Sequence, residues 1–293
     1  MDLGIVIVNY NTRALLRRCL ETVFASAGVT FCVCVVDNAS ADGSAAMVAA
    51  DFPQVLLIAN ADNPGYPTAN NQGLRALGFG EGVVGAPCRH ALLLNPDTEV
   101  PPTAFAEVVQ FIDAHPAVGV VGPKLVRPDG SLDRACRRSF PTLAVAFYHI
   151  VGLSRLFPRS RRFARYNLTY LDPDQMAEVD SVVGAFMLVR GAALAQVGLL
   201  DEAFFMYGED LDWAYRIKAA DWQVIYYPAV TVLHVKRAAS RQNPHSRVAF
   251  WRAMEIFYRK HYAEDTPRML HALVILTLRI LTWMTQLRVR WQR

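Results

Sequence analysis

Few cysteines and little net charge characterise this sequence of 293 residues. The five cysteines are an odd number and include no C-x-x-C pair, which argues against a disulfide framework or a zinc site. Cys32 and Cys34 fall on one face of an expected strand, so we expect reduced thiols with a structural role. The formal charge of +4 is too small for a protein that wraps nucleic acid.

We also expect no secretory leader on this sequence. Met1 is followed within two residues by a strand-like run, residues 3–8. A charged segment, an apolar segment and a cleavage site do not fit in that space. We therefore expect a cytoplasmic chain. Internal repeats and low-complexity tracts are absent from the sequence as well.

Short apolar runs alternate with helix-like segments through the first half of the chain. With 53% hydrophobic residues, the chain can bury one large α/β core with a small appendage. The alternation predicts a mostly parallel central sheet with helices on both faces. The expected strands are residues 3–8, 31–36, 55–58, 91–94 and 118–121, and the expected helices are residues 12–25, 42–50, 68–77 and 102–115.

Polar residues follow four of these strands. Ligands of such sheets bind beyond the carboxyl ends of the strands, so we expect the four clusters to face one crevice. Any one of them alone is also explained as ordinary turn or cap residues. The clusters are Asn9-Tyr10-Asn11, Asp37-Asn38-Ala39-Ser40, Asn63-Pro64-Gly65-Tyr66 and Asn95-Pro96-Asp97.

Asn95-Pro96-Asp97 puts a carboxylate at the mouth of a very apolar strand. A carboxylate there can hold Mg²⁺ or Mn²⁺ by oxygen ligation, and the ion would neutralise the diphosphate of a leaving nucleotide. A helix cap before Pro101 is the alternative role for Asp97. His234 ends a later strand, where a neutral imidazole could complete the metal site; a structural histidine is the alternative.

Three carboxylates stand at an expected helix start, behind the aromatic turn Phe204-Phe205-Met206-Tyr207-Gly208. They are Glu209, Asp210 and Asp212. The dipole at a helix start favours ionised acids, and a sheltered carboxylate is what a general base requires. An N-terminal capping cluster would explain one or two acids but not the aromatic lead-in.

Seven ordered blocks of this sequence resemble the family-2 inverting glycosyltransferases of GT-A fold, in the branch that includes bacterial rhamnosyltransferases. They span about two-thirds of the chain. The blocks are residues 6–11 (VIVNYN), 36–44 (VDNASADGS), 63–73 (NPGYPTANNQG), 93–97 (LLNPD), 183–190 (VGAFMLVR), 197–212 (VGLLDEAFFMYGEDLD) and 227–234.

The resemblance implies a role for each block. Asp210 is the catalytic base with Glu209 beside it, and Asp97 is the metal ligand of a D-x-D-type motif whose first acid is here Asn95. Asp37 hydrogen-bonds a pyrimidine base. The other residues assigned to the nucleotide-sugar and acceptor pocket are Asn9, Tyr10, Asn11, Asn38, Gly65, Tyr66, Asn70, Gly184, Ala185 and Phe186.

The chain is expected to divide at residue 240. Residues 1–240 form the GT-A domain, with a nucleotide-binding half (1–122) and an acceptor and catalytic half (123–240) that carries an insertion (140–175). Residues 241–293 form an extension of amphipathic helices. The basic residues crowd into 155–165 and the last few positions, which predicts a local anionic partner such as lipid headgroups or an isoprenoid diphosphate.

Residues 269–287 are largely apolar, but Arg279 stands in their middle, and a central arginine costs roughly 2.5–3.5 kcal/mol on insertion scales. A helical wheel predicts a helix that lies in the membrane surface, on the inner face of the plasma membrane. A helix that packs on the core or mediates dimerisation is the alternative. The apolar stripe is Leu270, Leu273, Val274, Ile280, Leu281, Met284 and Leu287; the polar one is Arg279, Thr282, Gln286, Arg290 and Arg293.

Together these features predict a metal-assisted transferase. It would move a sugar, rhamnose by resemblance, from a dTDP- or UDP-linked donor to a cell-surface glycan or an isoprenoid-diphosphate-linked acceptor. One alternative is a binding protein that lost the chemistry, against which Asp97 and Asp210 argue. Another is a sugar-1-phosphate nucleotidyltransferase, but its glycine-rich basic loop is replaced here by Asn9-Tyr10-Asn11.

Overall fold

The computed structural model describes residues 1–83, 85, 87–235 and 246–291. A sheet forms its centre, with the strand order β3-β2-β1-β4-β8-β6-β9-β5 and β7 paired to β9. The strands are β1 (Leu3–Asn9), β2 (Phe31–Asp37), β3 (Leu56–Ala59), β4 (His90–Leu94), β5 (Thr98–Glu99), β6 (Val118–Val126), β7 (Ala177–Glu178), β8 (Phe186–Arg190) and β9 (Gln223–His234).

The strands β3, β2, β1 and β4 from the first part of the chain are parallel, as the alternating pattern predicts. Their fully apolar stretches explain the arrangement, since a parallel strand is covered on both faces. Helices α1 (Arg13–Phe24), α2 (Ser44–Asp51), α3 (Tyr66–Ala76) and α4 (Ala104–Ala114) alternate with these strands along the chain. The α/β class is therefore confirmed, and the carboxyl ends of β1, β2 and β4 lie at the same edge.

The second half of the sheet is mixed. β8 runs antiparallel between β4 and β6, while β9 is parallel to β6. The apolar runs at 224–227 and 230–235 predict two strands separated at Pro228; this prediction is wrong, because β9 is one strand with a register shift beside Pro228. A bulge accommodates the proline, which cannot donate to a ladder. The apolar run at 181–189 likewise predicts a strand, but the observed strand is shorter and begins at Phe186.

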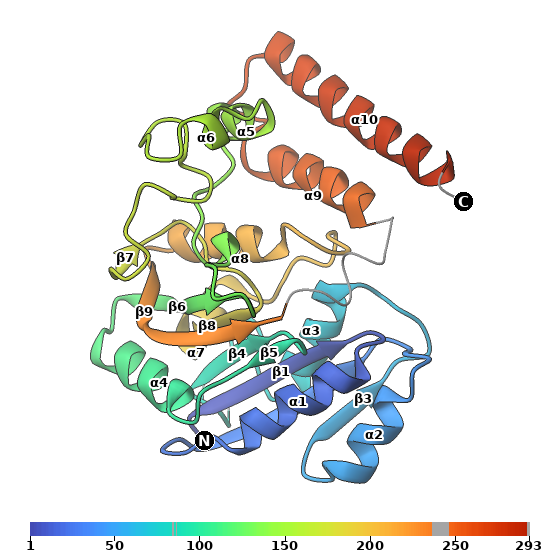
Figure 1. The fold of residues 1–293 in the computed structure, drawn as a ribbon, viewed down its shortest axis with the longest axis vertical. Coiled ribbons are helices and arrows are strands. Elements are labelled where there is room, and N and C mark those ends of the chain that lie inside the picture. Colours follow the sequence, from blue (N-terminus) through green and yellow to red (C-terminus); the bar gives the residue numbers. More distant parts are fainter. Residues whose placement is uncertain (84, 86, 236–245, 292–293) are drawn as a thin grey trace.

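Helices α5 (Leu143–Ile150) and α6 (Leu153–Leu156) lie in the expected insertion, after the short turn η1 (Arg134–Cys136). Helices α7 (Gly191–Val197) and α8 (Glu209–Ala219) follow, and α9 (Ser246–His261) and α10 (Arg268–Trp291) end the chain. Figure 1 shows α5, α6 and α10 at the end of the molecule away from β1–β3. The five cysteines are free thiols, and four of them are buried.

Helix α10 packs on α9 and also exposes a large apolar face. Ile275 and Leu278 are buried, and His271 stacks on Tyr258 of α9. By length and composition α10 could cross a membrane. Its exposed apolar side chains are Met269, Leu270, Leu273, Leu276, Ile280, Trp283 and Met284.

Candidate functional site

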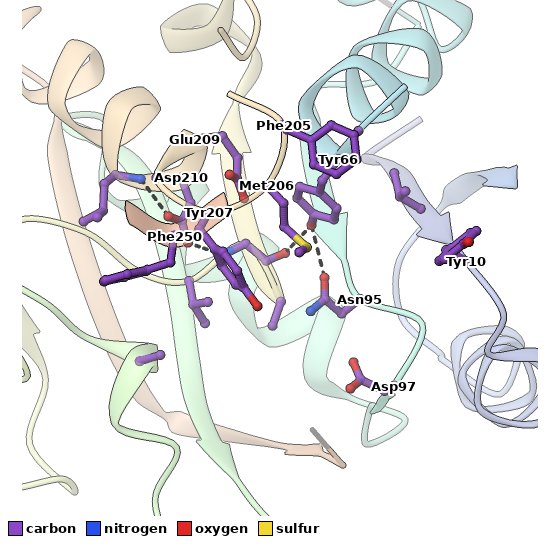
Figure 2. Close-up of a pocket in the computed structure, with 18 of the residues that line it drawn as sticks. Tyr10, Tyr66, Asn95, Asp97, Phe205, Met206, Tyr207, Glu209, Asp210 and Phe250 are labelled. Carbon is purple, nitrogen blue, oxygen red and sulfur yellow. Dashed lines mark hydrogen bonds between the residues drawn. The ribbon is translucent and has the colours of Figure 1, made fainter. Parts of the chain in front are cut away.

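A cleft of about 310 Å³ opens at the carboxyl ends of β1, β2 and β4 and is closed on the other side by the start of α8. It brings together most of the residues that the sequence singles out. Figure 2 shows Tyr66 and Asn95 between Asp210 on one side and Asp97 on the other. The expected site residues that line it are Tyr10, Asn38, Gly65, Tyr66, Asn95, Asp97, Gly184, Ala185, Glu209, Asp210 and His234.

Five expected site residues do not line this cleft: Asn9, Asn11, Asp37, Asn70 and Phe186. Asn9 and Asp37 are buried and bind each other, with 2.7 Å between Asn9 Nδ2 and Asp37 Oδ2. The Asn70 side-chain amide donates to the Tyr66 carbonyl, and the buried ring of Phe186 lies 6.0 Å from that of Phe105. These side chains hold the cleft walls in position, and the role of Asp37 toward a pyrimidine base stays a prediction.

The loops after β1 and β2 are bound to each other by side chains that resemble ordinary turn residues. Ser40 Oγ accepts hydrogen bonds from Asn9 Nδ2 and from the Asn11 backbone N–H, and the Ser40 N–H donates to Asp37 Oδ1. Asn11 adopts a φ of 53°, a left-handed conformation that asparagine tolerates. These contacts agree with the turn explanation, and the roles of Asn9 and Asn11 in a nucleotide pocket stay predictions.

The aromatic turn before α8 aims the acids into the cleft. Tyr207 and Gly208 have φ values of 70° and 85°, so two successive residues are left-handed. The turn rests on Gly65, where an added Cβ would lie 2.7 Å from the Phe205 carbonyl oxygen. The Tyr66 N–H donates to that oxygen at 2.8 Å. Only glycine allows this approach, and the contact ties the loop after β3 to the start of α8.

Asp210 is held by three donors. Arg138 Nη2 lies 2.6 Å from Asp210 Oδ2, the Gly184 N–H donates to the same oxygen at 3.1 Å, and the Leu211 N–H donates to Oδ1. Both partners of the ion pair are buried, with side chains 10% and 7% exposed. The guanidinium supplies a counter-charge and fixes the plane of the carboxylate at the cleft wall.

Glu209 differs from its neighbour because, among the described residues, it forms no ion pair. Its Oε2 is buried and makes no hydrogen bond within the described part of the chain. Burial, and then the charge of Asp210, raise the pKa of Glu209 to about 8. The raised pKa favours the protonated form of Glu209 at neutral pH, whereas Asp210 has the Arg138 guanidinium as a counter-charge.

Asp212, the third acid, is structural. Its carboxylate binds Arg216 Nε at 2.9 Å, Lys260 Nζ at 2.9 Å and His261 Nε2 at 2.7 Å. Burial alone would raise the pKa of Asp212, but these partners lower it to about 2. Because Lys260 and His261 belong to α9, the carboxylate joins α8 to the C-terminal helices.

Asp97 and His234 meet at the opposite end of the cleft. His234 Nε2 lies 3.3 Å from Asp97 Oδ1, and its Nδ1 lies 2.9 Å from Oδ2 of the buried Asp133. Burial lowers the pKa of His234, but the hydrogen bonds to Asp133 and Asp97 outweigh it and raise the pKa to about 9. The backbone supports this pairing, since Thr98 of β5 lies opposite His234 of β9.

The donor set at this end fits a hard divalent ion. Asp97 offers a partly exposed carboxylate, and Asn95 offers an amide oxygen. Within the residues that the structure describes, no group of three His, Cys, Asp or Glu side chains could hold a metal alone. Mg²⁺ and Mn²⁺ sites of this type are completed by substrate phosphates and water, so one protein carboxylate with a neighbouring amide is compatible with such an ion.

Tyr66 connects the two ends of the cleft. Its hydroxyl lies 3.1 Å from Asn95 Oδ1 and 3.2 Å from the Gly184 carbonyl oxygen. Burial raises the pKa of Tyr66, so the hydroxyl keeps its proton and acts as a donor. Asn95 is thereby oriented with its amide oxygen toward Tyr66, although a flipped amide would exchange the roles.

Sequence reasoning missed Arg138 and Asp133. Each contacts a predicted site residue far along the chain. The residue numbers of Arg138 and Asp210 differ by 72, and those of Asp133 and His234 differ by 101. No local pattern marks either residue as functional. Tyr166, Phe250 and Met254 also line the cleft without having been predicted, and they come from the insertion and from α9.

Comparison with known sequences agrees with this geometry. The profile of the family described as "Glycosyltransferase like family 2" matches residues 2–253. An N-acetylglucosaminyl-diphospho-decaprenol L-rhamnosyltransferase of Mycobacterium tuberculosis (strain H37Rv) is 32% identical over 249 residues, which are 84% of this chain and 80% of the relative. The low-salt glycan biosynthesis hexosyltransferase Agl10 of Haloferax volcanii is 24% identical over 80% of this chain and 67% of its own.

Solved structures share the fold at low sequence identity. The mannosyltransferase PcManGT from Pyrobaculum calidifontis, in complex with GDP-Man and Mn²⁺, aligns with a TM-score of 0.56 and 16% identity over 97% of this chain and 84% of that one. TarS 1–349 of S. aureus, in complex with UDP-GlcNAc, aligns with a TM-score of 0.55 and 14% identity over 97% of this chain and 73% of that one. The expected GT-A fold is therefore confirmed.

Proposed function

The chain belongs to glycosyltransferase-like family 2, and on that basis we propose that it is an inverting transferase of a sugar from a pyrimidine nucleotide diphosphosugar. The observation that carries this proposal is that two carboxylates lie at opposite ends of one cleft. Asp97 at one end is suited to bind a metal, and Asp210 at the other end is paired with an arginine. By analogy with the mycobacterial relative, the sugar is rhamnose and the acceptor is a glycan or a sugar on an isoprenoid diphosphate.

In the proposed reaction, the acceptor hydroxyl attacks C1 of the donor sugar from the side of Asp210. The bond between that oxygen and C1 forms while the bond from C1 to the diphosphate breaks, and Asp210 takes the hydroxyl proton. Gly184 and Arg138 hold the base during this step. A single displacement inverts the anomeric centre and forms no sugar–enzyme adduct.

Asp97 and Asn95 would hold Mg²⁺ or Mn²⁺ against the donor diphosphate, and His234 beside Asp97 would join them only as a neutral imidazole, which its raised pKa disfavours. When bound, the ion neutralises the charge that develops on the leaving nucleoside diphosphate. Tyr10 and Asn38 lie on the wall formed by the ends of β1 and β2, where the nucleoside would bind. Residues 1–240 would form the transferase domain, and 241–293 its helical extension.

The donor and its metal are tested together. Thermal shift and release of nucleoside diphosphate are measured with dTDP- and UDP-linked sugars, with Mn²⁺ or with excess chelator. We expect one donor to raise the melting temperature and to be turned over only with metal. Asp97→Ala should lose both responses, whereas loss of a helix cap alone would cost about 1 kcal/mol and leave kinetics intact. Full turnover in chelator contradicts the metal proposal, and transfer of nucleotide to a sugar phosphate would indicate a nucleotidyltransferase.

We propose that the enzyme is a peripheral membrane protein and that the exposed apolar face of α10 contacts the membrane. Leu276 and Trp283 are 56% and 59% exposed, so replacing both with glutamate changes this face with little effect on the core. We expect the double variant to lose sedimentation with liposomes while it keeps donor hydrolysis.

The matched control for that experiment is Leu56→Glu with Met176→Glu, which adds the same charge at exposed apolar sites outside α10. β3, which contains Leu56, lies at the other end of the molecule from α10 (Figure 1). If both double variants sediment with liposomes as the unmodified protein does, α10 does not bind the membrane. A changed oligomeric state of the α10 variant alone would assign this face to a protein contact instead.

A further inference from the structure

The segment between Asp133 and Asp172 carries eight arginines and no aspartate, glutamate or lysine. Two of the eight are committed inside the protein: Arg138 pairs with Asp210, and Arg137 donates to the Leu171 and Asp172 carbonyls. The other six are exposed: Arg134, Arg155, Arg159, Arg161, Arg162 and Arg165. Such an excess of one charge is repulsive unless an anion relieves it.

Three of the exposed arginines gather around a hollow of about 460 Å³ at the N-terminal turn of α5. Arg161, Arg162 and Arg165 line it together with Thr142 and Tyr148. Arg162 Nε donates to the Tyr148 hydroxyl at 3.3 Å, and its guanidinium lies over the Tyr148 ring. Within the described part of the chain these arginines form no ion pair with a carboxylate, so the hollow has the charge and the fork-shaped donors of an anion site.

This hollow adjoins the catalytic cleft. Arg165 lines the hollow and Tyr166, the next residue, lines the cleft; consecutive Cα atoms are about 3.8 Å apart. The Tyr166 carbonyl accepts a hydrogen bond from the Ser139 N–H, and Ser139 follows Arg138, which holds Asp210. An anion in the hollow would therefore lie beside the wall that carries the base.

Large apolar side chains surround the same region. Phe147 and Ile150 of α5 are 58% and 51% exposed, and Leu156 of α6 is 69% exposed. Val151 and Phe157 are exposed beside them. Figure 1 shows α5 and α6 at the same end of the molecule as α10. The hollow thus combines a polyanion site with an apolar rim, which suits a diphosphate that is esterified to a long hydrocarbon chain.

We infer that Arg161, Arg162 and Arg165 bind the diphosphate of an isoprenoid-linked acceptor, with its hydrocarbon chain along α5 and α6 and its sugar in the cleft at Asp210. The inference rests on the proposed function, because it assigns the acceptor half of the same site. It assigns these arginines a positioning role: the diphosphate that they anchor fixes how far the sugar hydroxyl reaches toward the base.

Binding of farnesyl diphosphate, measured by calorimetry in chelator, tests this inference directly. Chelator removes metal-bridged binding of the probe at Asp97. We compare Arg161→Gln/Arg165→Gln with Arg155→Gln/Arg159→Gln, which removes the same charge from the same segment outside the hollow. Only the first variant should lose affinity, by about tenfold or more, because charge-assisted hydrogen bonds are lost. Inorganic diphosphate should bind more weakly than farnesyl diphosphate, and only Arg161→Gln/Arg165→Gln should lose affinity for it. Farnesol should bind the unmodified protein and both double variants with equal affinity.

Three outcomes overturn the inference. Equal loss in both double variants indicates a diffuse attraction of charge, and unchanged affinity in both means that the hollow does not bind diphosphate. Sedimentation with phosphatidylglycerol vesicles distinguishes a lipid headgroup from an isoprenoid diphosphate as the ligand. If Arg161→Gln/Arg165→Gln loses vesicle binding but keeps affinity for farnesyl diphosphate, the hollow binds lipid headgroups instead.

The proposed function is checked separately on the same proteins. Release of nucleoside diphosphate by donor hydrolysis does not involve the acceptor, so both double variants should hydrolyse donor as the unmodified protein does. Absence of donor binding and hydrolysis in the unmodified protein would refute the proposed function. The affinity of the hollow for farnesyl diphosphate would still be measurable in that case, so the two failures are distinguishable.

Discussion

Replacing Asp210 with asparagine is expected to lower turnover roughly 10²–10⁴-fold while donor affinity stays nearly unchanged. Asparagine has almost the same size but cannot accept the acceptor's proton. The measurement is steady-state transfer at saturating donor, with donor affinity measured by thermal shift. Because Arg138 loses its buried counter-charge in this variant, the melting temperature is measured as well, to show that the remaining protein is folded.

Glu209→Gln is the matched control for Asp210→Asn. Glutamine mimics the protonated glutamic acid that the structure predicts at neutral pH, so turnover should remain close to that of the unmodified protein. Since folding raises the pKa of Glu209 to about 8, its favourable contribution is complete below the unfolded pKa and is lost as pH rises through about 8. Glu209→Gln should therefore reduce the loss of stability in this range. Normal turnover of Asp210→Asn with an inactive Glu209→Gln would identify Glu209 as the base.

The second large effect is on stability. Asp212→Ala is expected to lower the free energy of unfolding by about 3–5 kcal/mol at neutral pH, because Arg216 loses its buried partner and α9 loses the Lys260 ion pair and the His261 hydrogen bond to α8. Urea unfolding measures the change. Asp51→Ala is the matched control: the pair between Asp51 and Arg17 is about 40% exposed, so its loss should cost about 0–1 kcal/mol.

The stabilisation by Asp212 has a defined pH dependence. Its pKa is lowered to about 2 in the folded protein, so its contribution is present above the unfolded pKa of about 3.8 and is lost as pH falls through about 2. The difference in stability between the unmodified protein and Asp212→Ala should narrow over this acid range. A constant difference down to the lowest measurable pH would mean that Asp212 acts through packing and not through its charge.

Local sequence predicted the strands of residues 1–122 well. The apolar runs at 31–36 and 91–94 lie within β2 and β4, because a buried parallel strand leaves an uninterrupted apolar segment in the sequence. The site was found for a related reason: Asp97 and Asp210 stand next to element ends, where a strand stops or a helix starts. Prediction was less successful around β9, where the proline suggested a break and the ladder with β6 continued past it.

The sequence by itself determined the α/β class, the positions of the first four helices to within two residues at their starts, the carboxylates that face the cleft and the excess of arginine in the insertion. Tertiary structure alone decided that the three neighbouring carboxylates of α8 have different environments and different roles. Glu209, Asp210 and Asp212 lie within four residues on one helix, yet burial raises the pKa of Glu209, Asp210 pairs with Arg138, and Asp212 joins α8 to α9. The physical reason is that the charge state of a buried acid depends on burial and on partners far away in the chain, and no local pattern encodes either.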